Sequence, residues 1–173
     1  MGRKGIVFMD SNEITIHNVT APDIDEVAVL FDAYRVFYGK TSDIITAKNF
    51  LSDRIASEES NIILAKINDK CVGFVQLYPF FSSVNASRLL VLNDLFVDPN
   101  HRRMGVAKEL MESATILARE TKCKGLILET TNDNTNAQSL YTKLGWTEEL
   151  GVCLLYTSPS PRDLSTSRMP SSA

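Results

Sequence analysis

The chain is poor in the residues that build metal centres and disulfide frameworks. It has three cysteines, Cys71, Cys123 and Cys153, and two histidines, His17 and His101. No two cysteines form a CxxC pair, so a zinc site is not expected. An odd set of scattered cysteines is typical of a reducing compartment, where buried thiols behave as small apolar side chains. We therefore predict a cytoplasmic protein without a bound metal.

Other absences exclude further classes of protein. No apolar run approaches the roughly 18 residues that a membrane-spanning helix needs, so no membrane segment is expected. The formal net charge of -3 lacks the basic excess of most nucleic-acid-binding proteins. The GxxxxGK[ST] pattern of P-loop proteins and the GxGxxG pattern of dinucleotide-binding folds do not occur. Without a GxSxG motif, a hydrolase is a weak alternative.

The 173 residues, with 44% hydrophobic content, are enough for one domain with a sizeable core. We place this domain at residues 1–151. Residues 157–173 contain six serines and three prolines, a composition typical of disorder. Residues 153–163 also resemble the translation of a sequencing-library adapter. Residues 152–173 are therefore predicted to be an artefactual or disordered tail, whose apolar start replaces a missing final strand; a genuine Ser/Pro-rich tail is the alternative.

Apolar periodicity predicts the secondary structure. A period of two indicates strands, and a period near 3.6 between capping residues and glycines indicates helices. The predicted strands are residues 14–17, Asn61–Ile67, 71–78 (ended by Pro79), Ser87–Val97, 126–130 and a last strand from Trp146; the predicted helices start at Thr20, Thr46 and Val106 and span 136–144. Residues 80–83 are predicted to form a loop. The order is strand, two helices, three antiparallel strands, helix, strand, helix, strand. It predicts an α+β fold with a mixed, mostly antiparallel sheet flanked by helices.

The most informative stretch is residues 92–110, LNDLFVDPNHRRMGVAKEL. An apolar strand leads through a basic loop with the pattern R-x-x-G-x-A into a helix. The first amides of a helix have no intrahelical partner, and the helix dipole favours anions there. A small residue at Gly105 lets a phosphate approach the backbone. We interpret the stretch as a pyrophosphate site; a solvated basic turn that caps a helix is the alternative.

This stretch resembles the acetyl-CoA motif of the GNAT family of N-acetyltransferases. A second stretch, residues 134–146, resembles the closing motif of the same family, N-x-x-A-x-x-L-Y-x-K-x-G followed by an aromatic residue. The resemblance runs from Ile14 to about Gly151. Two shorter runs, YGKTSD and QLYP, resemble a bacterial and fungal branch related to yeast acetyltransferases of histones, polyamines or amino acids.

The resemblance implies a GNAT-like fold and a set of residues that bind acetyl-CoA as the acetyl donor. Strand backbone would pair with the pantetheine arm, the loop and helix start would bind the pyrophosphate, and an asparagine would hold the pantetheine. The implied donor-binding residues are Leu95, Phe96, Val97, Arg102, Arg103, Met104, Gly105, Val106, Ala107, Lys108 and Asn134.

The resemblance also implies Tyr141 as the acid that protonates the leaving thiolate of coenzyme A; a core aromatic on a short helix is the alternative. The acceptor ammonium must lose a proton, and Asp94, beside the thioester, is our first candidate for the base. Glu129 is the second candidate. Alternatively, Asp94 orders Asn93 or the following helix, and Glu129 holds the polar loop.

The acceptor amine is expected to contact the end of the first helix, through Tyr34, Arg35 and Tyr38, and the strand residue Tyr78. Packing is the alternative role for each tyrosine, whereas Arg35 would suit an acceptor with a carboxylate. The expected acceptor is a small-molecule amine, a polyamine, an amino acid or a protein lysine. The resemblance also allows a homodimer. We therefore predict an acetyl-CoA-dependent N-acetyltransferase; an acyl-CoA-binding sensor without turnover is the alternative function.

Overall fold

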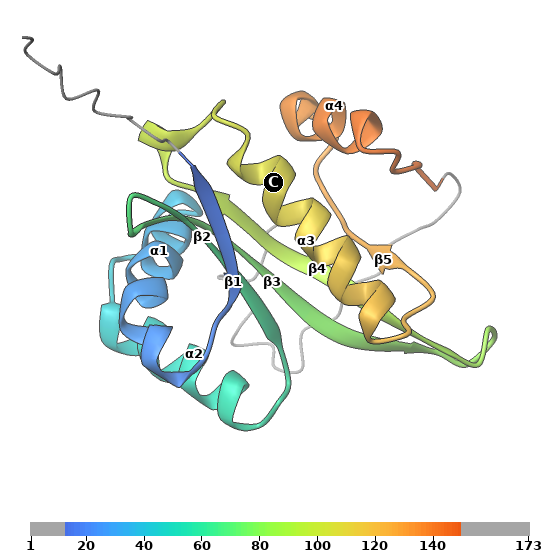
Figure 1. Ribbon diagram of the computed structural model, residues 1–173, viewed down its shortest axis with the longest axis horizontal. Helices are drawn as coiled ribbons and strands as arrows, with labels where there is room; N and C mark the ends of the chain where they lie inside the picture. Colours follow the sequence, from blue (N-terminus) through green and yellow to red (C-terminus); the bar gives the residue numbers. More distant parts are fainter. Residues whose placement is uncertain (1–12, 150–173) are drawn as a thin grey trace, which may run out of the picture.

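The computed structural model describes residues 13–149 as one sheet with helices on both faces (Figure 1). The strands are β1 (Ile14–Asn18), β2 (Asn61–Ile67), β3 (Lys70–Ser82), β4 (Ser87–Val97) and β5 (Leu126–Ile127). The helices are α1 (Ile24–Phe37), α2 (Ile44–Ala56), α3 (Val106–Glu120) and α4 (Thr135–Lys143), with short 3-10 turns at Ala21–Asp23 and Pro99–His101. The predicted α+β class is confirmed.

The five strands lie in the order β1-β2-β3-β4-β5. The first four form antiparallel neighbours, and β5 pairs with β4 in parallel. A two-residue turn joins β2 to β3, in which Asn68 and Asp69 both have positive φ angles of 50° and 59°. This conformation matches the twist of a tight hairpin and suits Asn and Asp. This turn joins the two strands that the sequence predicts at Asn61–Ile67 and 71–78.

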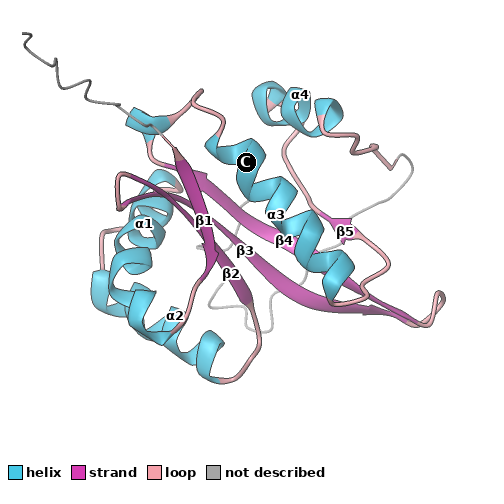
Figure 2. Ribbon diagram, in the orientation of Figure 1, coloured by secondary structure: helices cyan, strands magenta, loops and turns pink. Residues whose placement is uncertain are grey.

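Successive residues of the central strands pack into two separate hydrophobic cores, one on each face of the sheet. Ile62, Leu64 and Phe74 pack against α1 and α2, whereas Ile63, Ala65 and Val75 pack against α3 and α4. This follows from the period of two in a strand, because successive side chains point to opposite faces. The sheet is thus the middle of three layers. Figure 2 shows α3 crossing the sheet and α4 near its N-terminal half.

Strand β3 runs past Pro79 to Ser82, so the predicted end at Pro79 and the predicted loop at residues 80–83 were wrong. The neighbouring strand β2 begins at Asn61, which pairs with Leu77. Beyond Leu77, β3 is therefore an edge strand, where the missing N–H of proline costs no ladder hydrogen bond. The resulting β3–β4 hairpin extends beyond β5 in Figure 1.

Several other bounds differ from the sequence prediction. Helix α1 begins at Ile24 after a 3-10 turn instead of at Thr20, and α4 spans Thr135–Lys143 instead of 136–144. Helix α2 begins at Ile44 instead of Thr46, because the Asp43 side chain accepts a hydrogen bond from the Thr46 N–H (2.9 Å) and caps the helix. Strand β5 is two residues long instead of five. Residues 146–149 do not form a strand. The rest of the predicted last strand and the tail lie outside the described residues.

A buried carboxylate holds the connection between α1 and α2. Asp32 is 5% exposed, and it accepts hydrogen bonds from the Ser42 hydroxyl and from the Asp43 N–H (2.8 Å). Arg35 adds a third hydrogen bond, from Nη1 to Asp32 Oδ1 (3.1 Å). The bonds from Ser42 and Asp43 keep the pKa of Asp32 below its usual value. The last turn of α1 is thereby fixed against the start of α2.

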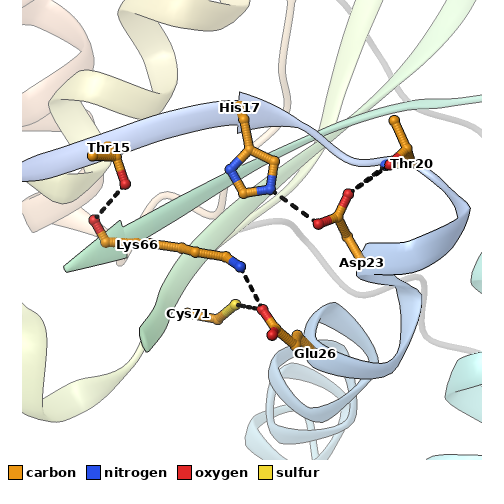
Figure 3. A network of polar contacts seen from close by, with 7 residues as sticks. All are labelled: Thr15, His17, Thr20, Asp23, Glu26, Lys66 and Cys71. Atoms are coloured by element: carbon orange, nitrogen blue, oxygen red, sulfur yellow. Dashed lines mark hydrogen bonds and ion pairs between the residues drawn. The ribbon is translucent and has the colours of Figure 1, made fainter. Parts of the chain in front are cut away.

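A second polar network ties the start of α1 to β1, β2 and β3 (Figure 3). Glu26 Oε2 accepts hydrogen bonds from Lys66 Nζ (2.6 Å) and from the Cys71 thiol (2.9 Å). His17 on β1 lies 3.3 Å from Asp23 Oδ1, at the start of α1. Burial, and then the neighbouring Glu26, raises the pKa of Cys71 to about 12. Cys71 is therefore a neutral thiol donor in this network at physiological pH.

A glycine in β3 lets α3 pack close to the sheet. A Cβ atom at Gly73 would lie 2.9 Å from the Phe96 carbonyl oxygen and 3.0 Å from Val106 Cγ1. Both distances are shorter than normal van der Waals contact. Val106 is the first residue of α3. Because Gly73 has no side chain, the start of α3 can pack closely against β3 and the neighbouring β4.

We expect Gly73→Ala to lower the free energy of unfolding by about 1–3 kcal/mol, because the added methyl group overpacks against backbone and the start of α3. Gly125→Ala is the matched control, since its Cβ would meet only Leu89 Cδ2, at an ordinary 3.9 Å. That control should change stability by no more than about 0.5 kcal/mol. Denaturant unfolding measures both; equal effects of the two substitutions would contradict the packing argument.

Candidate active site

The candidate site forms where β4 and β5 part. Strand β5 pairs with β4 only at Leu90 and Val91. Two residues later β4 contains a bulge: Gln76 pairs with Asp94 but Leu77 pairs with Leu92, so Asn93 is an extra residue. From Asp94 to Val97, no strand among residues 13–149 pairs with the β5-facing edge of β4. Backbone groups on this edge are therefore available to a ligand.

The bulge also exchanges the faces of the sheet to which β4 side chains point. Leu92 packs in the core under α3. Without the extra residue, Asp94 and Phe96 would follow Leu92 to that face. Instead, Phe96 packs in the α1 core and Leu95 and Val97 pack in the α3 core. Asp94 is thereby turned toward α1.

The basic loop is held in a fixed shape between β4 and α3. The Asp98 side chain accepts from the Asn100 N–H (2.8 Å), and Arg102 Nε donates to the Val97 carbonyl (3.2 Å). Arg103 and Gly105 have positive φ angles of 63° and 91°. Helix α3 then begins at Val106, and its first amides have no carbonyl partner within the helix. These free donors, with the exposed cations around them, form the predicted anion site.

A cavity of about 430 Å³ joins the loop, β4, α1 and α4. Nine of the eleven predicted donor-binding residues line the cavity, whereas Met104 and Asn134 do not. Its lining residues are Tyr34, Phe37, Tyr38, Leu95, Phe96, Val97, His101, Arg102, Arg103, Gly105, Val106, Ala107, Lys108, Asn136, Ala137, Leu140 and Tyr141.

Tyr141 enters the cavity from α4. It is 6% exposed and packs near Trp146, with 6.2 Å between the ring centroids. Burial, and then the nearby Tyr38, raises the pKa of Tyr141 to about 12, so the phenol carries its proton at neutral pH. Asn134 caps this helix: its Oδ1 accepts from the Ala137 N–H (3.3 Å), and its Nδ2 donates to Thr130 (3.1 Å). Asn134 therefore positions the helix that carries Tyr141.

Asp94 lies beside the cavity but is not one of its lining residues. Its carboxylate is 5% exposed and accepts hydrogen bonds from Tyr34 and from Asn93 Nδ2 (3.1 Å). Burial raises the pKa of Asp94, and these two hydrogen bonds oppose the shift only in part. The Asp94 carboxyl therefore binds a proton more readily than an exposed aspartate.

The predicted acceptor residues divide into two groups. Tyr34 and Tyr38 line the cavity and pack edge to face, with ring centroids 4.9 Å apart. Arg35, Tyr78 and Glu129 do not line it. Arg35 Nη1 is bound to Asp32 and to the Asp43 carbonyl, and Glu129 is exposed on the segment after β5. The structure thus brings two of the five together at the cavity.

Some residues that line the cavity were not predicted from the sequence. Phe37 is 58% exposed, and the Arg102 guanidinium lies 5.7 Å from its ring centre. Phe37 lies in the last turn of α1, outside both family motifs. His101 lies inside the basic loop, and Asn136 lies inside the second motif. Because His101 and Asn136 lie inside the two motifs, the motifs could have indicated them.

Comparison with known proteins identifies the family. The model of the acetyltransferase (GNAT) family matches residues 27–146. The chain belongs to the GNAT family. It is 40% identical over 138 residues to an uncharacterised N-acetyltransferase, YhfO, of Bacillus subtilis, covering 80% of this chain and 93% of that protein. It is 31% identical over 108 residues to a probable acetyltransferase of Haemophilus influenzae, covering 62% of this chain and 74% of that protein.

Solved structures of acetyltransferases have the same fold as this chain. A probable acetyltransferase superposes with a TM-score of 0.78 at 36% identity, covering 84% of this chain and 99% of the other. An aminoglycoside acetyltransferase from a soil metagenome has the same fold, with a TM-score of 0.75 at 19% identity, covering 87% and 99%. This GNAT protein is therefore an acyltransferase, and the predicted enzyme class is confirmed. In residues 13–149, no helix could span a membrane, and no cluster of His, Cys, Asp and Glu side chains could hold a metal.

Asp94 should make stability depend on pH. A carboxyl whose pKa is raised by folding stabilises the native state fully below the ordinary Asp pKa of about 3.9. This contribution is lost as the pH rises through the raised pKa of folded Asp94. Asp94→Asn lacks this loss, so its stability relative to the wild type should increase across that window. Denaturant unfolding at a series of pH values measures it; a difference that stays constant with pH would contradict a raised pKa.

Proposed function

We propose that this GNAT protein transfers the acetyl group of acetyl-CoA to a primary amine by direct attack in a ternary complex. The observation that carries the proposal is the cavity itself. One space contains the open edge of β4, the cationic start of α3 and the protonated Tyr141. The acceptor is a small-molecule amine, a polyamine, an amino acid or a protein lysine, and a cytoplasmic location remains a prediction from the cysteine pattern.

The residues of the loop fit a pyrophosphate. Gly105 has a positive φ angle, and the space around its absent side chain is open, with only Ile14 Cδ1 within 4 Å (3.9 Å). A phosphate can therefore approach the backbone there. Arg102 and Arg103 are exposed and add positive charge. Lys108 is partly neutralised by Glu112, 3.6 Å away, so it contributes less to the attraction than the two arginines.

The open edge of β4 fits the pantetheine arm, because Leu95, Phe96 and Val97 line the cavity beside unpaired strand backbone. Bound acetyl-CoA supplies the acetyl group as a thioester. Tyr141 holds a proton at its phenol oxygen, which suits donation to a leaving sulfur at neutral pH. The proton that the acceptor nitrogen releases on forming the amide restores the phenol.

Asp94 is the proposed final acceptor of the first proton, which an alkylammonium must lose before its nitrogen can attack. Its raised pKa makes the carboxylate a stronger base than an exposed aspartate. Tyr34 and Tyr38 form an aromatic wall on the acceptor side. Aromatic faces beside a buried carboxylate suit a cationic amine. The Arg35 guanidinium is bound to Asp32 and to the Asp43 carbonyl, so it is not part of this aromatic wall.

We expect Gly105→Glu to abolish coenzyme A binding, because the carboxylate would occupy and repel the phosphate position. The substitution also strains a left-handed backbone, at a cost of about 1–3 kcal/mol. Gly145→Glu is the matched control, since Gly145 has a φ angle of 84°, open surroundings and no place in the cavity lining. Calorimetric titration with coenzyme A measures both variants; affinity retained in Gly105→Glu, or lost equally in both, would overturn the assignment.

Tyr141→Phe should lower kcat by about 10²-fold or more, because it removes the proton donor and keeps the ring that packs near Trp146. The dissociation constant for acetyl-CoA should change little. Steady-state turnover with a panel of amines and binding titrations give the two quantities. A parallel loss of both would assign Tyr141 to packing. Tight binding of acetyl-CoA by the wild type with no turnover on any amine would favour the sensor function instead.

A further inference from the structure

The acceptor amine has no direct route by which its proton could pass to Asp94. Asp94 is the buried carboxylate with a raised pKa, yet it does not line the cavity and is only 5% exposed. An amine in the cavity would not reach the carboxylate directly. A group between the two must carry the proton, and that group must touch both the cavity and Asp94.

Tyr34 meets both conditions. Its side chain lines the cavity, and its hydroxyl donates a hydrogen bond to the Asp94 carboxylate. The other side chain that donates to Asp94 is Asn93, whose amide has no proton-accepting role and whose residue is exposed outside the cavity lining. Tyr34 is held in place by edge-to-face contacts with Phe74 and Phe96, with ring centroids 6.0 and 6.1 Å away.

We propose that Tyr34 relays a proton from the acceptor ammonium to Asp94, an inference that rests on the proposed acetyltransferase function. An N–H bond of the ammonium breaks as the proton joins the Tyr34 oxygen. The original Tyr34 O–H bond breaks as its proton joins the Asp94 carboxylate. The ammonium and carboxylate charges cancel, which leaves a neutral amine, a neutral phenol and a carboxylic acid. Atoms and charge balance without another reactant.

The surroundings of Tyr34 favour a concerted transfer. Burial, and then the charge of Asp94, raises the pKa of Tyr34 far above its ordinary value, so a free phenolate does not form. The relay therefore passes one proton on as it receives another. The titratable groups around the pair are Tyr38, just after α1, and Tyr78 on β3, with Arg54 and Glu59 near Tyr78. Burial raises the pKa of Tyr78 to about 12, so this phenol keeps its proton at physiological pH.

A buried oxygen on β3 suits the protonated form of Asp94. Gln76 occupies the paired position across from Asp94 and is fully buried. Its Nε2 donates to Ser60 Oγ (3.1 Å), whereas its Oε1 has no hydrogen-bond partner among the described residues. Paired side chains on one face of a sheet have Cβ atoms roughly 5 Å apart. An acceptor oxygen is thus close to the carboxyl that gains the proton.

The test compares Tyr34→Phe with the wild type on two amines. With an alkylamine that is protonated at the assay pH, kcat/KM should fall by about 10²-fold, and the rise of rate with pH through the raised pKa of Asp94 should disappear. With a fluorinated alkylamine that is already neutral at that pH, the variant should stay within about threefold of the wild type. Asp94→Asn should behave alike, and the double variant should lose no more than either single variant.

A second measurement needs no activity. In the protein without acetyl-CoA, NMR titration of the Asp94 carboxyl carbon should show a higher pKa in Tyr34→Phe, because the variant loses a hydrogen bond that favours the carboxylate. An unchanged Asp94 pKa, an unchanged pH profile or an equal loss with both amines would overturn the relay. A wild type that acetylates no amine would overturn the proposed function itself, which separates the two failures.

Discussion

The extra residue at Asn93 in β4 is the constraint on which the site depends. It turns Asp94 and Phe96 toward α1 and leaves Leu95 and Val97 facing α3. Beyond it, β4 has no strand partner on the side of β5 within the described chain. A single insertion therefore places the buried carboxylate, next to strand backbone that the short β5 leaves unpaired. A regular strand of the same composition would turn Asp94 to the face of α3.

The charges of the site are divided across the sheet. Arg102, Arg103 and the amides that begin α3 make one end of the cavity positive, whereas Asp94 is an acid buried beside the aromatic wall at the other end. In the proposed reaction, the basic loop would attract the anionic donor, and Asp94 would attract the cationic acceptor. Tyr34 stands between the cavity and the acid.

Much of the fold could be predicted from local patterns. Apolar runs between turn residues predicted the bounds of Asn61–Ile67 and Ser87–Val97, and the basic loop was recognisable from its glycine and cations. The bulge could not be predicted, because a bulge is a property of pairing between strands and leaves no period in one strand. The role of Gly73 depends on a helix 33 residues later, and the contact of Arg35 with the Asp43 carbonyl depends on how α2 packs. Such features are set by tertiary contacts.

The long β3–β4 hairpin has a consequence for association between chains. Beyond Leu77 its β3 edge is unpaired in the described structure, and its tip exposes Phe81 (70%) and Val84 (97%). An open edge next to apolar side chains is the usual template for the addition of a foreign strand. Pro79 removes one N–H from that edge, so an incoming strand meets a gap in the ladder of donors. The same proline that did not end the strand thus protects it against aggregation.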